Sequence, residues 1–166
     1  MAEKSKRALS TKTTAASATA SKAKKSSATF SDAEKAAMKE RAAELKKQSK
    51  GAGKGAAAGE ADVLAKIAEL APADRAIAER IHALAKEHAP SLTPKTWYGM
   101  PGYARDGKVA VFFQGAAKFG TRYGTLGFQD GATLDDGDMW PTAYAITKLT
   151  PAVERRIGEL FKRAAM

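Results

Sequence analysis

Large apolar residues recur at helical spacing in two neighbouring stretches in the middle of the chain. Between Glu60 and Pro90 they repeat every three or four residues, as on one face of a helix. These apolar positions are Val63, Leu64, Ile67, Leu70, Ile77, Ile81 and Leu84. Residues 71–72 (Ala-Pro) interrupt the pattern, and Asp74 is placed to cap or open the second helix. We therefore expect two short helices that form a helical hairpin or corner.

A further helix is predicted at the C-terminal end. Thr150 followed by Pro151 is typical of an N-cap and a first helical residue. The apolar positions after it again have helical spacing; they are Val153, Ile157, Leu160 and Phe161.

Between Pro90 and Thr150 the apolar period changes to two, which predicts strands. Asp106-Gly107 is a typical two-residue hairpin turn, because both positions favour a positive φ. Residues 109–113 after it are apolar on both faces, which is typical of a central strand covered on both sides. Residues 122–128 and 141–149 are predicted as further strands. The expected fold is α+β, with an N-terminal helical pair, a mostly antiparallel sheet and a C-terminal helix.

The N-terminal part of the chain has a different character. Residues 1–30 contain few large apolar side chains and are predicted to be a disordered basic tail. Ser31 and Glu34 form a capping-box pattern that starts a helix over residues 31–49. Its apolar face is thin, so we expect this helix to be isolated or weakly docked. Residues 50–59, rich in Gly and Ala, are predicted to be a linker before the folded unit of residues 60–166.

The net charge of +10 is unevenly distributed. Residues 1–59 hold 14 Lys and Arg against 5 Asp and Glu, whereas residues 60–166 hold 14 against 13. The basic tail is therefore a candidate arm that contacts nucleic-acid phosphates without reading sequence, and a solubilising role is the alternative. The candidate residues of this arm are Lys4, Lys6, Arg7, Lys22, Lys24 and Lys25.

Composition restricts the chemistry. The chain has no cysteine, which excludes disulfides, thiolate metal sites and cysteine nucleophiles. No apolar run reaches the roughly 20 residues that span a bilayer, and we expect a cytoplasmic protein without a membrane partner. His82 and His88 are six residues apart, which places them on different sides of a helix and unsuited to one metal. Residues 102–109 resemble a phosphate-binding loop, but the Gly lies in a hairpin turn and the final hydroxyl is replaced by Val109.

Two clusters remain as candidate sites. Aromatic and small residues gather at a bend before the hairpin, where they either line a ligand pocket or fill the core. These candidate ligand residues are Trp97, Tyr98, Met100, Pro101 and Tyr103. An acidic loop holds Asp135, Asp136 and Asp138, whose oxygens either bind a hard cation or form turns and face solvent.

The segment APSLTPKTWYGMPGYARDGKVAVFFQGAAKFGTRYGTLGF resembles the DUF1801, or YdhG-like, family of small bacterial domains. The resemblance covers about residues 60–166 and rests on the Tyr-Gly-Met-Pro bend, the Gly-Lys-Val start of an apolar strand and the Gly-rich strand after it. It implies an α+β domain with a curved antiparallel sheet. Some relatives are described as frataxin-like iron chaperones, which implies iron as a cofactor or cargo.

From these observations we expect a small binding or carrier domain for iron or a small ligand rather than an enzyme. The alternative is a nucleic-acid-associated protein that uses the basic arm. The sequence shows no motif for nucleophilic catalysis, and an enzymatic function would need a pocket with a titratable Asp, Lys or Tyr.

Overall fold

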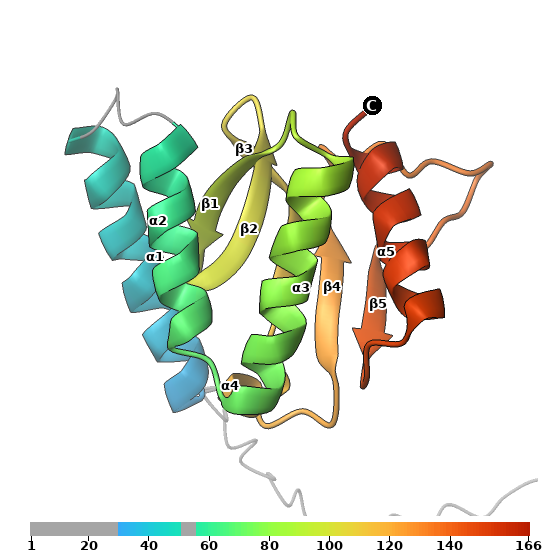
Figure 1. Cartoon of the computed structure of the whole chain (residues 1–166). Helices are drawn as coiled ribbons and strands as arrows, with labels where there is room; N and C mark the ends of the chain where they lie inside the picture. Colours follow the sequence, from blue (N-terminus) through green and yellow to red (C-terminus); the bar gives the residue numbers. More distant parts are fainter. Residues whose placement is uncertain (1–29, 51–55) are drawn as a thin grey trace, which may run out of the picture.

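The centre of the molecule is an antiparallel sheet of five strands in the order β1-β2-β3-β4-β5 (Figure 1). The computed structural model describes residues 30–50 and 56–166. The strands are β1 (Thr93–Trp97), β2 (Met100–Arg105), β3 (Lys108–Gln114), β4 (Gly124–Phe128) and β5 (Ala143–Ile146). Together with the helices before and after the sheet, this arrangement confirms the predicted α+β fold.

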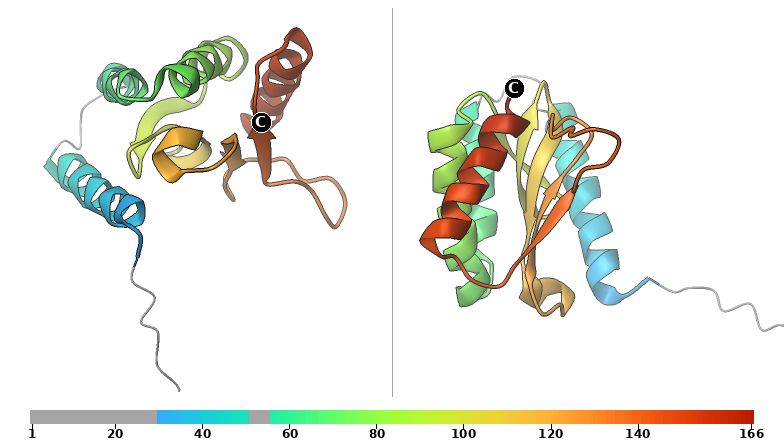
Figure 2. Two further views of the ribbon diagram at one scale, coloured as in Figure 1. Left: turned by 90° about the horizontal axis from the view of Figure 1, so that it is seen from below. Right: turned by 90° about the vertical axis from the view of Figure 1, so that its right-hand side faces the viewer.

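Three helices cover one face of the sheet (Figure 2). They are α2 (Ala56–Ala68), α3 (Pro72–His88) and α5 (Pro151–Ala164). Most of the predicted apolar positions are buried, and Val63, Ile67, Ile81 and Phe161 are almost fully so. Leu64 is the exception, because it is 46% exposed on the outer side of α2. The strands contribute Tyr103, Val111, Phe113 and Leu126 to the same core. The N-cap of α5 is also as predicted, because the Thr150 hydroxyl accepts a hydrogen bond from the Val153 amide at 3.3 Å.

Two tight turns connect the first three strands. Asp106 and Gly107 join β2 to β3 with φ values of 48° and 78°, which confirms the predicted hairpin. Tyr98 and Gly99 join β1 to β2 in the same way, with φ values of 53° and 70°. The predicted bend of the aromatic cluster is thus the turn of a second β-hairpin, in which Trp97 pairs with Met100.

Strand β3 is the central strand, as its apolar faces predict. Val111 and Phe113 are fully buried on the side of α2, α3 and α5. Phe112 points to the opposite side, where its ring lies over Gly127 of the neighbouring strand and 4.7 Å, centroid to centroid, from Trp97. A bulge between β2 and β3 places Val109, rather than Ala110, opposite Ala104.

The remaining helices lie away from this three-helix layer. Helix α1 (Asp32–Lys50) lies across the opposite face of the sheet at its β1 end (Figure 2). The short helix α4 (Ala116–Phe119) joins β3 to β4 and is held by Asp74 of α3, whose carboxylate accepts a hydrogen bond from the Ala117 amide at 2.8 Å. Asp74 lies in the first turn of α3, as one of the two predicted alternatives has it, but its carboxylate caps α4 and not its own helix.

Several boundaries differ from the prediction. Strand β1 was not expected, and the strands expected over residues 122–128 and 141–149 are shorter, as β4 and β5. Helix α2 begins at Ala56, so residues 56–59 of the predicted linker are helical because alanines extend the helix. Most of the predicted tail, and residues 51–55 of the linker, lie outside the described residues. None of the described helices has the length and apolar character needed to cross a membrane.

Candidate functional site

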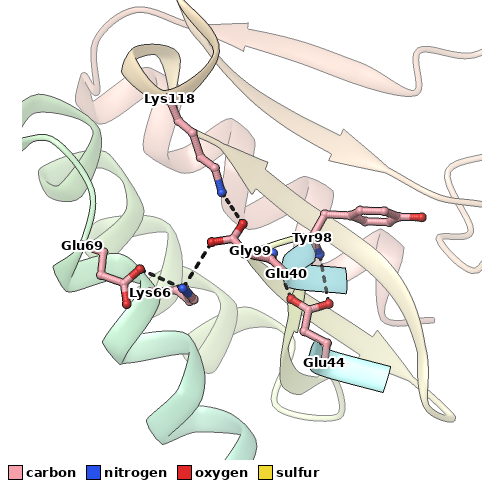
Figure 3. Close-up of polar contacts among 7 residues, drawn as sticks. All are labelled: Glu40, Glu44, Lys66, Glu69, Tyr98, Gly99 and Lys118. Carbon is pink, nitrogen blue, oxygen red and sulfur yellow. Dashed lines mark hydrogen bonds and ion pairs between the residues drawn. The ribbon is translucent and has the colours of Figure 1, made fainter. Parts of the chain in front are cut away.

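The turn between β1 and β2 binds a carboxylate of helix α1. The amide of Tyr98 donates a hydrogen bond to Glu44 Oε2 at 3.1 Å, and the amide of Gly99 donates to Glu44 Oε1 at 2.9 Å (Figure 3). Consecutive amides of a turn that point in one direction form a small anion-binding concavity. Glu44 is only 8% exposed, so this charge-assisted pair of hydrogen bonds is largely shielded from water.

A second carboxylate of α1 lies beside the same turn. Glu40 accepts hydrogen bonds from Lys118 at 2.5 Å and from Lys66 at 3.4 Å (Figure 3). Its carboxylate also lies against Gly99, and a Cβ atom on residue 99 would collide with it. The positive φ therefore favours glycine here, and any larger residue would also displace the Glu40 carboxylate.

Four elements that are far apart in sequence supply the groups of this site. Helix α1 supplies the carboxylates, the β1–β2 turn supplies the amides, and α2 and α4 supply Lys66 and Lys118. We call the two turn amides with Lys66 and Lys118 the anion site. Asp74 fixes α4 and thereby positions Lys118.

Further charged groups surround the anion site. The Lys66 ammonium donates to Glu69 at 2.8 Å, and this hydrogen bond, with the charge of Glu40, raises the pKa of Lys66 above its usual value. Lys66 therefore remains charged at neutral pH. Arg41 of α1 lies over the Tyr98 ring, 5.4 Å from its centroid, and pairs with Glu44 at 3.3 Å.

The predicted ligand residues divide between the two faces of the sheet. Trp97 and Tyr98 are half-buried at the turn, with ring centroids 5.0 Å apart, and Met100 is buried beside them. Pro101 and Tyr103 are buried on the core side. Tyr103 packs on Phe161 and approaches His82 Nδ1 at 3.3 Å, and burial raises the pKa of its hydroxyl. Only the first three residues thus lie at the anion site.

The acidic loop between β4 and β5 does not gather its carboxylates. Asp135, Asp136 and Asp138 are all exposed. Within the part of the chain that the structure describes, no group of three or more His, Cys, Asp or Glu side chains could hold a metal ion. Asp135 instead lines a shallow cavity of about 190 Å³ together with Phe128, Leu134 and Trp140.

The two histidines do not come together either. His82 is buried beside Glu60, with His82 Nε2 3.4 Å from Glu60 Oε1. His88 is half-buried and packs against Gly158 of α5. The arm residues Lys4, Lys6, Arg7, Lys22, Lys24 and Lys25 lie outside the described residues.

Sequence reasoning missed the charged members of the anion site. Glu40 and Glu44 are four residues apart and therefore lie on one face of a helix whose apolar face is thin. This pattern was the one available indication that the helix docks through charged side chains. Nothing in the sequence indicates that their partners lie in the aromatic turn, because 54 residues separate Glu44 from Tyr98.

Comparison of the chain with protein-family models, with curated proteins and with solved structures finds no match in any of the three. The resemblance to the DUF1801 family therefore stays an expectation from the sequence.

Proposed function

We propose that this protein is a small binding domain whose ligand carries a carboxylate group and binds at the anion site. The observation that supports this proposal is the two-point contact of the Glu44 carboxylate with the Tyr98 and Gly99 amides. A hydrogen bond to a charged group contributes about 1.5–3 kcal/mol, and two from a rigid turn also fix the orientation of the carboxylate.

The lysines add the second element of recognition. Lys66 and Lys118 converge on Glu40 from two different helices, and both side chains are only about one-quarter exposed (27% and 26%). Partial burial reduces screening by water and salt, so their attraction for an anion exceeds that of surface lysines. A ligand with two carboxylates a few ångströms apart can therefore use the turn amides and the lysines together.

The aromatic residues of the turn give this ligand an apolar neighbour. Trp97 and Tyr98 are half-buried beside the two amides, where their rings can contact an apolar part of the ligand. The iron role implied by the family resemblance draws no support from the arrangement of the aspartates.

The proposal is tested by titrating glutarate, a small dicarboxylate, into the full-length variant with Glu40→Gln and Glu44→Gln. In this variant no carboxylate of α1 faces the turn amides or the two lysines. We expect glutarate to shift the backbone amide signals of Tyr98 and Gly99 in a nitrogen–proton correlation spectrum, with saturation in the millimolar range.

Two matched double variants test whether Lys66 and Lys118 contribute to glutarate binding. Adding Lys66→Met and Lys118→Met should weaken glutarate binding about fivefold or more, because two partly buried charges are lost. Lys108→Met with Lys162→Met removes the same charge from exposed positions and should leave the affinity within about twofold. Absence of any shift at Tyr98 and Gly99, or equal weakening by both pairs, would contradict the proposal.

A further inference from the structure

We infer that helix α1 is an internal competitor for the anion site, and that the external ligand is an acidic helical segment with two carboxylates one turn apart. This inference rests on the proposed function and adds to it the form of the partner and the regulation of the site. In the closed state described here, Glu44 occupies both turn amides and Glu40 occupies both lysines.

Charged contacts dominate the docking of α1. The large apolar residues Met38 and Leu45 of α1 are 43% and 50% exposed, and Phe30, just before the helix, is 58% exposed. By contrast, Glu44 is almost fully buried against the turn, and Glu40 bridges two elements of the folded unit. A helix held mainly by ion pairs and amide hydrogen bonds is easier to exchange for another acidic segment than a helix with an apolar core.

The spacing of the two carboxylates defines the partner. Residues four apart lie on one face of a helix, about one turn from each other. Glu44 reaches the amides and Glu40 reaches the lysines because the anion site presents its two halves at this same separation (Figure 3). An external helix with a Glu-x-x-x-Glu pattern therefore fits where α1 lies.

Departure of α1 also uncovers the aromatic part of the turn. Arg41 lies over the Tyr98 ring, and the Tyr98 and Trp97 rings are in edge contact. A partner with Arg or Lys directly after its first glutamate reproduces this cation–π contact. The preferred ligand is thus an acidic helix that also carries a cation at that position.

The short connection between α1 and α2 explains why the site would be closed at rest. Only residues 51–55 separate the two helices, so α1 competes at an effective concentration in the millimolar range. An external helix with the same contacts must compete against this high local concentration of α1. Substitutions that weaken the docking of α1 increase the population of the open state, in which α1 has left the anion site. The apparent affinity for the external helix should rise by the same factor as that population.

The experiment uses the full-length protein and a labelled peptide with the sequence of residues 30–50, and measures binding by fluorescence anisotropy. Glu40→Gln with Glu44→Gln opens the site by removing the internal carboxylates. Ala36→Gly with Ala42→Gly opens it independently, because both positions are exposed and glycine weakens the helix without touching the anion site. Glu79→Gln with Glu87→Gln is the charge-matched control.

We expect both opened variants to bind the peptide about tenfold or more tightly than the wild-type chain, and the control to bind like the wild type. Lys66→Met with Lys118→Met should abolish the gain. A peptide with Gln in place of Glu40 and Glu44 should also lose the gain in affinity.

Different results would contradict the inference about α1 and the proposed function. If the wild-type and opened proteins bind the peptide equally, while glutarate still shifts the Tyr98 and Gly99 amides, α1 is no competitor and only this inference is overturned. If neither glutarate nor the peptide shifts those amides in either opened variant, the proposed function itself is wrong. Agreement between the two opened variants excludes misfolding of one of them as the cause.

Discussion

Two independent features favour glycine at position 99. Its φ of +70° favours glycine, and the Glu40 carboxylate occupies the space that a Cβ would need. Gly107 has a similar φ of +78°, but no atom lies within 4 Å of its added Cβ. Substitution of Gly107 therefore measures the effect of the positive φ alone, whereas substitution of Gly99 also measures the effect of the contact with Glu40 of α1.

We expect Gly107→Ala to lower the free energy of unfolding by about 1 kcal/mol, which is the usual penalty for an L-residue with positive φ. Gly99→Ala should lower it by about 1 kcal/mol more, since Glu40 must also move and its lysine partners lose their contact. Urea unfolding of both variants measures the difference. Equal losses would mean that the contact of Glu40 with the turn contributes nothing to stability.

Thr150 illustrates a residue whose role the sequence reveals fully. Its hydroxyl caps α5, as the Thr-Pro pair predicts. Thr150→Ala should destabilise the protein by about 1 kcal/mol, because the Val153 amide loses its partner. Thr147→Ala, at an exposed position just before the helix, should change the melting temperature little. Thermal unfolding of the two variants measures both melting temperatures. Similar decreases in the two variants would argue against a stabilising N-cap at Thr150.

At the scale of elements, most of the secondary structure follows from apolar spacing, and the exceptions have local causes. Strand β1 has the sequence Thr-Pro-Lys-Thr-Trp, which lacks an apolar alternation and contains a proline. Proline is tolerated there because β1 is an edge strand. Tyr98-Gly99 also gives a weaker turn signal than Asp-Gly, so the sequence predicts a bend there and not the hairpin of β1 and β2.

The contact of α2 with α3 contains a titratable pair. Hydrogen bonds from Lys86 first, and then from His82, hold the pKa of Glu60 below its ordinary value of 4.5. A carboxyl whose pKa is lower in the folded than in the unfolded state stabilises the fold above the unfolded pKa. This stabilisation disappears as the pH falls through the lower, folded value.

Glu60→Gln should therefore be less stable than the wild type at pH 7, and the difference should shrink as the pH falls below about 4.5. Urea unfolding at a series of pH values measures it. Glu79→Gln, on the exposed face of α3, serves as the control. A difference that stays constant from neutral to acid pH would show that the Glu60 charge does not stabilise the α2–α3 contact.

At the scale of the whole molecule, the candidate site was only half predictable. The sequence located the turn, because Trp97, Tyr98 and Met100 are concentrated there, but it did not reveal the carboxylates and lysines that meet at the turn. Apolar spacing reports which face of an element is buried, whereas ion pairs between distant elements leave no local period. The ion pairs of Glu40 with Lys66 and Lys118 join distant elements and therefore leave no such pattern in the sequence.

For the basic tail we predict a second function that is independent of the anion site. Residues 1–29 hold seven Lys and Arg against a single Glu and contain no aromatic residue. Attraction to phosphates is thus the interaction that this composition favours, with no means of stacking on bases. Each phosphate contact should contribute about −0.9 to the slope of log affinity against log salt concentration.

We predict that the full chain retards a short duplex DNA at low salt in a gel-shift experiment, whatever the DNA sequence, and that a chain starting at Phe30 does not. Removing residues 1–29 leaves every described element in place, so a loss of binding can be attributed to the tail. Changing Lys4, Lys6, Arg7, Lys22, Lys24 and Lys25 to Gln in the full chain should have the same effect, because it removes six of the seven basic side chains and keeps the length. Equal retardation of all three proteins would assign any DNA binding to the folded unit, and retardation of none would leave the tail without this role.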